Sequence, residues 1–144
     1  MYHVTRIDES ENVLPAAYAD RSKGFSRQQL VGKSQGSPHM GLYVCTLEPK
    51  GYVDAVVHSF EISVYVLSGE LVITMLGAST TLGPDSVMAV PVGVTYSVRA
   101  GNGPVSWLLM SAPAPFEDTR RKDTFFTGEQ LEATASAAFD IRDP

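Results

Sequence analysis

The sequence predicts an all-β domain in the form of a small antiparallel barrel or jelly roll. Eight short segments rich in Val, Leu, Ile, Tyr and Thr lie between residues 41 and 112, each bounded by Gly, Pro or Asp. β-Branched and aromatic residues favour strands, while the bounding residues favour turns. With 144 residues, 44% of them hydrophobic, the chain can form one core and is too short for two.

The turn residues support this strand pattern. The expected strands are 41–47, 52–58, 62–67, 70–76, 79–82, 86–90, 95–99 and 105–111. Ser68-Gly69-Glu70 has the composition of a tight hairpin turn, because glycine permits the positive φ that such turns need. Pro91 stands at a strand end, where its missing N–H costs no ladder hydrogen bond.

Three regions are expected within one domain. Residues 1–37 are polar and turn-rich and predict an irregular N-terminal arm, residues 38–113 form the barrel, and residues 114–144 form an extension. In the extension, Thr127 and Gln130 have the spacing of a capping box, and Leu131, Ala135 and Ala138 recur at helical spacing. The sequence therefore predicts a short C-terminal helix packed on the barrel or on a second subunit.

Composition excludes several classes of function. A formal net charge of -5 offers no basic surface for nucleic acid. Cys45 is the only cysteine, so neither an internal disulfide nor a multi-cysteine zinc site can form. The first twelve residues lack the apolar segment of a signal peptide, and no run is long enough to span a bilayer. We expect a soluble cytoplasmic protein without a membrane partner.

Three segments carry a resemblance to a known family. The letters VHSFE at 57–61, YVLSGE at 65–70 and PVGVTY at 91–96 resemble, in order and spacing, the two motifs of the cupin superfamily. The resemblance covers roughly residues 41–112 and implies the cupin double-stranded β-helix, a jelly-roll barrel. It also implies a homodimer, formed through the N-terminal arm.

The metal ligands of the cupin motifs are mostly missing from this chain. The four ligand positions fall on Val56, His58, Ile62 and Tyr96. Valine and isoleucine have no lone pairs, so His58 is the only matching ligand and no metal cofactor is expected. The alternative is a rebuilt site for Mn, Fe, Ni or Zn, in which His39 or His3 arrives from the arm or Tyr96 ligates as a phenolate.

What remains at the expected barrel mouth is a mostly apolar pocket around His58 and Tyr96. The expected lining residues are Val56, His58, Ile62, Tyr96, Tyr43, Trp107 and Met110, of which the last three equally suit the core. His58 can act as an acid or base, and the Tyr96 hydroxyl can donate a hydrogen bond to an oxyanion. They are the candidate catalytic pair; the alternative is a structural hydrogen bond between them.

Other polar residues have simpler interpretations. Arg27 is favoured as an exposed surface residue, with a carboxylate clamp delivered by the arm as the alternative. Arg99, Asp54 and Glu61 are expected to face solvent, and Cys45 suits a small buried position.

Two functions stay open from the sequence. The favoured one is a metal-free module that binds a small polar or aromatic metabolite in the barrel. The alternative is a lyase, isomerase or hydrolase that acts through His58 and Tyr96 or through a rebuilt metal site. The segments at 36–41, 48–51 and 58–61 are most similar to cupins related to ureidoglycine aminohydrolase, which are manganese-dependent bicupins.

Overall fold

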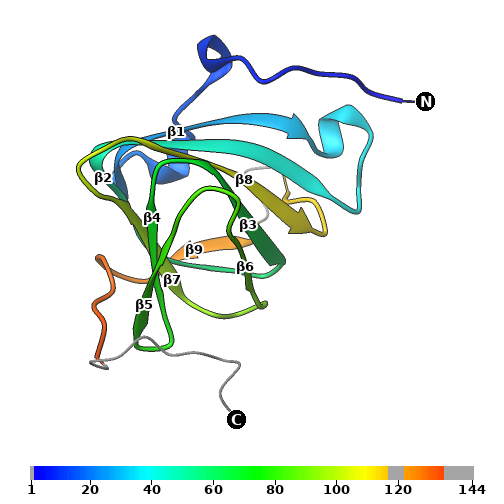
Figure 1. The fold of residues 1–144 in the computed structure, drawn as a ribbon. Helices are drawn as coiled ribbons and strands as arrows, with labels where there is room; N and C mark the ends of the chain where they lie inside the picture. Colours follow the sequence, from blue (N-terminus) through cyan, green and yellow to red (C-terminus); the bar gives the residue numbers. More distant parts are fainter. Residues whose placement is uncertain (1, 117–121, 135–144) are drawn as a thin grey trace.

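The computed structural model describes residues 2–116 and 122–134, which form strands and short 3-10 helices. In chain order the elements are η1 (Glu9–Glu11), η2 (Ala16–Tyr18), β1 (Ser22–Val31), η3 (Lys33–Gln35), β2 (Gly41–His58), β3 (Glu61–Ser68), β4 (Leu71–Met75), β5 (Ala78–Leu82), β6 (Val87–Val90), β7 (Tyr96–Ala100), β8 (Val105–Ala112) and β9 (Thr124–Phe126). The strands form one nine-stranded antiparallel sheet in the order β5-β4-β7-β2-β8-β3-β6, with β1 and β9 also paired to β2 (Figure 1). The predicted all-β jelly-roll class is confirmed.

The long strand β2 joins the two halves of the barrel. Its first half pairs with β8, its second half pairs with β7 and β9, and β1 pairs with both halves, from Leu42 to Val53. Between the halves, Glu48, Pro49 and Lys50 are exposed, and Lys50 has a φ of 61°. The sequence predicted two strands separated by a break here, whereas in the structure β2 is one continuous strand that bends at these residues. The other six expected strands coincide with β3 to β8 to within one residue at each end.

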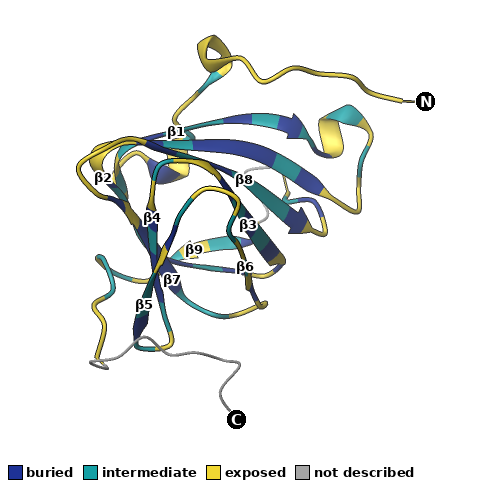
Figure 2. Ribbon diagram, in the orientation of Figure 1, coloured by how far each residue is buried: buried dark blue, intermediate teal, exposed yellow. Residues whose placement is uncertain are grey.

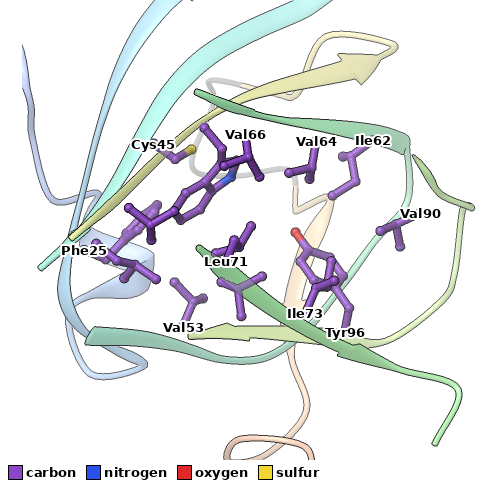
Figure 3. Close-up of a cluster of buried hydrophobic side chains, with 14 of the residues drawn as sticks. Phe25, Cys45, Val53, Ile62, Val64, Val66, Leu71, Ile73, Val90 and Tyr96 are labelled. Atoms are coloured by element: carbon purple, nitrogen blue, oxygen red, sulfur yellow. The ribbon is translucent and has the colours of Figure 1, made fainter. Parts of the chain in front are cut away.

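The core lies between the two halves of the sheet and follows the period-two alternation of the strands (Figure 2). Along β3, for example, Ile62, Val64 and Val66 are at most 1% exposed. They face Leu71 and Ile73 of β4 across the interior (Figure 3). Full burial of one such side chain contributes about 1.5–3 kcal/mol, so these residues are the main stabilising element of the barrel.

The turn predicted at Ser68-Gly69-Glu70 is confirmed. Gly69 has a φ of 77°, and an added Cβ would lie only 2.2 Å from the Pro104 carbonyl oxygen. Glycine is needed here for two reasons, the left-handed backbone and the close approach of a second chain segment.

The N-terminal arm differs from the prediction, because its second half is a strand of the barrel. β1 pairs with β2 along its whole length, from Ser22 opposite Val53 to Val31 opposite Leu42. Residues 6–8 lie against β1, where the buried Gln28 side chain accepts a hydrogen bond from the Asp8 N–H and donates one to the Arg6 carbonyl, whereas Tyr18 of η2 packs into the core. The boundary expected at residue 37 therefore separates β1 from β2, the strand with which it pairs.

The predicted C-terminal helix does not begin at Thr127. Residues 127–134 are not helical; instead the Thr127 N–H donates to the Ala55 carbonyl, and the Leu131 N–H donates to Ser97 Oγ. The Thr127 N–H, which a capping box would give to the Gln130 side-chain oxygen, is therefore already used, and the Gln130 side-chain NH2 donates to the Val53 carbonyl. Ala135 and Ala138, with the charged stretch 117–121, lie outside the described residues. Among the described residues, no helix has the length and apolar character to cross a membrane.

Candidate functional site

His58 faces the barrel interior because of an irregularity in β2. Val53 pairs with Val98, but Val56 pairs with Tyr96, so the register shifts between residues 53 and 56. A β-bulge of this kind reverses which residues point inward. Before the shift the buried residues of β2 have odd numbers, apart from Val44, and after it Val56 and His58 are buried.

Both ring nitrogens of His58 are hydrogen-bonded within the protein. Nε2 lies 2.7 Å from the Tyr96 hydroxyl, and Nδ1 lies 2.9 Å from Thr124 Oγ1 of β9. The imidazole also stacks on the Phe60 ring, with 4.5 Å between centroids. Neighbours on several sides therefore fix the orientation of the imidazole.

The network favours one tautomer of His58. Thr124 Oγ1 lies 3.5 Å from a carboxylate oxygen of Asp123, which only accepts hydrogen bonds when ionised. If Thr124 donates to Asp123, it accepts from Nδ1–H of His58, and Nε2 accepts from the Tyr96 hydroxyl. In the opposite arrangement the buried Tyr96 proton would have no acceptor among the described residues. The Nδ1–H tautomer satisfies every group.

The imidazole is neutral at physiological pH. Burial, and secondly the positive charge of Arg27, lower the pKa of His58 to about 4. Burial likewise raises the pKa of Tyr96 well above its ordinary value, so its hydroxyl keeps its proton. Neither group is poised to exchange a proton near pH 7.

His58 lies in the wall of a cavity of about 910 Å³ at the β9 end of the barrel. Its walls come from η2, β1, β2, β8, β9 and the residues around Pro115 and Asp123. The lining residues are Pro15, Ala16, Ala17, Tyr18, Asp20, Arg21, Arg27, Gln29, Tyr43, His58, Phe60, Leu109, Pro115, Phe116, Lys122, Asp123, Thr124, Phe125 and Phe126. The walls combine apolar and aromatic side chains with eight polar or charged ones, a mixture that suits a small organic molecule carrying polar groups.

Arg27 enters this cavity from β1. It pairs with Cys45 across the sheet and so shares the inner face of that residue. Its guanidinium carbon lies 4.5 Å from the centroid of the Tyr43 ring and 5.3 Å from that of Tyr18. The interpretation of Arg27 as an exposed surface residue is wrong, because the side chain is only partly exposed and lines the cavity.

The sequence of the barrel matches a known family. Residues 43–111 match the family described as the cupin domain. The chain contains a cupin domain. The predicted superfamily is thereby confirmed, and the barrel described above is the cupin jelly roll.

Solved structures of similar fold include proteins with different activities. A cupin-2 domain protein of Rhodospirillum rubrum has a TM-score of 0.68 and 15% identity, with 89% of this chain and 82% of that chain covered. The polyketide cyclase RemF of Streptomyces resistomycificus has a TM-score of 0.66 and 17% identity, with 81% and 89% covered. The DMSP lyase DddQ of Ruegeria pomeroyi has a TM-score of 0.63 and 22% identity, with 88% and 62% covered. At such identities the likeness concerns the fold, and no curated protein matches the sequence.

The residues at the cupin metal positions do not fit a metal ion. Val56, Ile62 and Tyr96 are buried apolar or phenolic side chains, and both nitrogens of His58 already have partners. Among residues 2–116 and 122–134, no group of three His, Cys, Asp or Glu side chains could hold a metal. His3 and His39, the proposed replacements, are exposed and do not line the cavity.

The cupin cavity contains only part of the expected pocket. Tyr43 and His58 line it, while Val56, Ile62 and Trp107 belong to the buried core. Tyr96 also lies in the core, behind His58, and reaches it through its hydroxyl (Figure 3 shows this tyrosine pointing inward). Met110 alternates with Trp107 and Leu109 along β8, so it lies on the outer face, and Leu109 lines the cavity in its place.

Of the remaining residues with sequence expectations, Arg99 and Glu61 are exposed as predicted, and Asp54 is partly exposed. Cys45 is buried, and burial raises the pKa of its thiol to about 12, as suits an unreactive position in the core.

Several cavity residues were missed by sequence reasoning. Tyr18, Thr124 and Phe126 come from segments assigned to the arm and the extension. The aromatic residues were the available signal, because Tyr18 and the pair Phe125-Phe126 are large apolar side chains in otherwise polar segments, and such side chains must find a partner.

Proposed function

We propose that this cupin domain binds a small polar or aromatic metabolite in the cavity beside His58, without a metal ion. The observation that carries the proposal is a cavity of about 910 Å³ whose walls combine aromatic rings with polar and charged side chains. Binding requires that the polar groups of the wall keep their positions. Hydrogen bonds between His58 and both Thr124 and Tyr96 hold these three side chains in place.

His58 shapes the wall of the site in this proposal. Its ring is committed on both nitrogens and stacked on Phe60, so it orients Thr124, whose side chain is partly exposed. Replacing His58 with Ala would remove the stacked ring and release Thr124. Ligand affinity is therefore expected to fall even if the ligand never touches an imidazole nitrogen.

The choice of compounds to test follows from the cavity and from the family resemblance. The aromatic walls favour flat organic molecules, while the likeness of segments 36–41, 48–51 and 58–61 to cupins related to ureidoglycine aminohydrolase adds ureides. Carboxylates, ureides and aromatic acids form the panel.

A thermal-shift screen of this panel, followed by calorimetric titration, tests the proposal. A ligand at a hundred times its Kd stabilises the native state by about 2.7 kcal/mol, which is readily seen as a rise in Tm. We expect at least one compound to raise the Tm of the wild type and to bind less tightly to His58→Ala. His39→Ala is the matched control, because His39 is exposed and lies outside the cavity lining. A panel without hits, or hits unaffected by His58→Ala, would contradict the proposal.

The alternative function is an enzyme that works through His58 and Tyr96. The observation in its favour is their short hydrogen bond of 2.7 Å at the cavity wall. Against it stand the low pKa of His58 and the raised pKa of Tyr96, which keep both groups neutral at pH 7. Proton NMR of a bound compound over several hours decides: turnover by wild type but not by Tyr96→Phe would establish the enzyme.

A further inference from the structure

We infer that the ligand of this cavity is a small carboxylate, anchored through its two oxygens by the guanidinium of Arg27. The inference rests on the proposed function and specifies the chemical class of the ligand. It assigns to Arg27 the role of specificity-determining residue.

Aromatic rings hold the guanidinium of Arg27 in the cavity. The inward side of β1 brings Arg27 into the cavity, where the rings of Tyr43 and Tyr18 lie 4.5 Å and 5.3 Å from its guanidinium carbon. The ring of Tyr18 in turn stacks on Phe25, with 5.0 Å between centroids, so this support is rigid. Contacts of this kind hold a cation in place without neutralising its charge.

The guanidinium of Arg27 has no carboxylate counter-ion among the described residues. Within the described ranges, Arg27 makes its contacts to the two tyrosines and forms no ion pair with a carboxylate. Asp123, an acidic residue of the lining, is already engaged, because one of its carboxylate oxygens accepts the Phe116 N–H at 2.5 Å. A partly buried guanidinium without an anion is unfavourable, and an anionic ligand would remove that cost.

The charges in the cavity lining favour an anionic ligand. The charge of Arg27, after burial, lowers the pKa of His58, and both residues line the same cavity. His58 is neutral, so it neither adds to this charge nor competes with Arg27 for an anion. Arg21 and Lys122 add two exposed positive charges to the lining, and Asp20 and Asp123 add two negative ones, which leaves the charge of Arg27 in excess. An anion entering the cavity meets a positive potential that strengthens toward Arg27.

The shape of the guanidinium favours a carboxylate over other anions. The planar guanidinium fork matches the two oxygens of a carboxylate, and the pair gains two parallel charge-assisted hydrogen bonds. One deep cation balances one negative charge, whereas a phosphate dianion would need more. The rings of Phe60, Phe116 and Phe126 in the lining can cover the apolar body of such an acid.

The experiment compares matched acids and amides at pH 7.5. Benzoate, 4-hydroxybenzoate and phenylacetate are titrated calorimetrically into the full chain, each beside its neutral amide. We expect the acids to bind at least about tenfold more tightly than the amides. Arg27→Met should remove that preference, and Arg27→Lys, which keeps the charge and loses the fork, should give an intermediate preference. Arg99→Met is the control, because Arg99 is exposed on β7 away from the lining.

The outcomes separate the inference from the proposed function. Equal affinity for acids and amides, or an acid preference that survives Arg27→Met, overturns the inference; if His58→Ala still weakens binding, the proposed function stands. Inorganic phosphate that displaces the acids at equal concentration also overturns the carboxylate assignment. The absence of binding by all six compounds overturns the inference, and the ureides and other compounds of the wider panel then decide the proposed function. If Arg27→Met does not fold, the acid and amide affinities of the wild type and Arg27→Lys decide.

Discussion

At His58, burial and the charge of Arg27 act in the same direction, and both disfavour the protonated imidazole. The consequence is a contribution of His58 to stability that depends on pH. The unfolded chain binds a proton at the ordinary pKa of 6.5, while the folded chain binds it only at about 4. Protonation therefore favours unfolding between these two values.

From this linkage we predict that the free energy of unfolding falls by roughly 3 kcal/mol as the pH is lowered from 6.5 to 4. Above about pH 7 the contribution of His58 is constant, because both states are then neutral there. Urea unfolding at a series of pH values measures the slope, with His58→Asn expected to flatten it and the exposed His39→Asn expected to leave it unchanged. Equal slopes for all three proteins would contradict the assignment.

The hydroxyl of Tyr96 provides a second test at the same scale. Tyr96→Phe leaves the buried Nε2 of His58 without a donor, which should cost about 1–3 kcal/mol of stability. Tyr65→Phe is the matched control, because its hydroxyl bonds to Asp85 at the exposed surface and its loss should cost less than about 0.5 kcal/mol. Chemical denaturation of both variants gives the comparison, and similar losses would argue against the buried pair.

Sequence reasoning placed His58 and Tyr96 together, and the structure joins them by a hydrogen bond. It placed Arg27 in the site only as the alternative, a carboxylate clamp, and favoured an exposed surface residue. The inward positions of β1 are Phe25, Arg27 and Gln29, and the two polar ones face the cavity. Polar residues at inward positions remove the apolar–polar alternation that identifies a strand in a sequence. For this reason β1 was not predicted as a strand.

At the scale of elements, tight turns made β3 to β8 predictable, since Gly and Pro mark where each strand ends. β9 could not be found in the same way. It has only three residues and depends on pairing with residues 56–58 of β2, far away in the sequence. The expected helix does not begin at Thr127 for a similar reason, because the N–H groups of Thr127 and Leu131 donate to the Ala55 carbonyl and to Ser97 Oγ, far away in the sequence.

The hairpin between β3 and β4 offers a direct test at this scale. Gly69→Ala should lower stability by more than about 1 kcal/mol, because the backbone has a positive φ and the new methyl group meets the Pro104 carbonyl. Gly83→Ala is the control, since nothing lies within 4 Å of its Cβ position. Thermal unfolding of the two variants should separate them clearly, and a Gly69→Ala protein as stable as Gly83→Ala would refute the close approach.

For the whole molecule, the homodimer stays a prediction. We predict a mass in light scattering of twice the 15.5 kDa of one chain, and a monomer when residues 2–14 are deleted. These residues lie against β1 of their own chain through Gln28, so in an exchanged dimer they would make the same contacts with a neighbour. A monomeric full chain, or a dimer unaffected by the deletion, would count against the arm as the interface.

The whole barrel also carries the central claim, which is that a cupin domain with one remaining ligand at its metal positions uses its cavity without a metal. Elemental analysis of the full chain, purified without added metal and without chelator, tests this most directly. We predict less than about 0.1 equivalent of Mn, Fe, Ni or Zn, because one histidine cannot hold such an ion against buffer. Near-stoichiometric metal that is lost in His58→Ala would contradict the account.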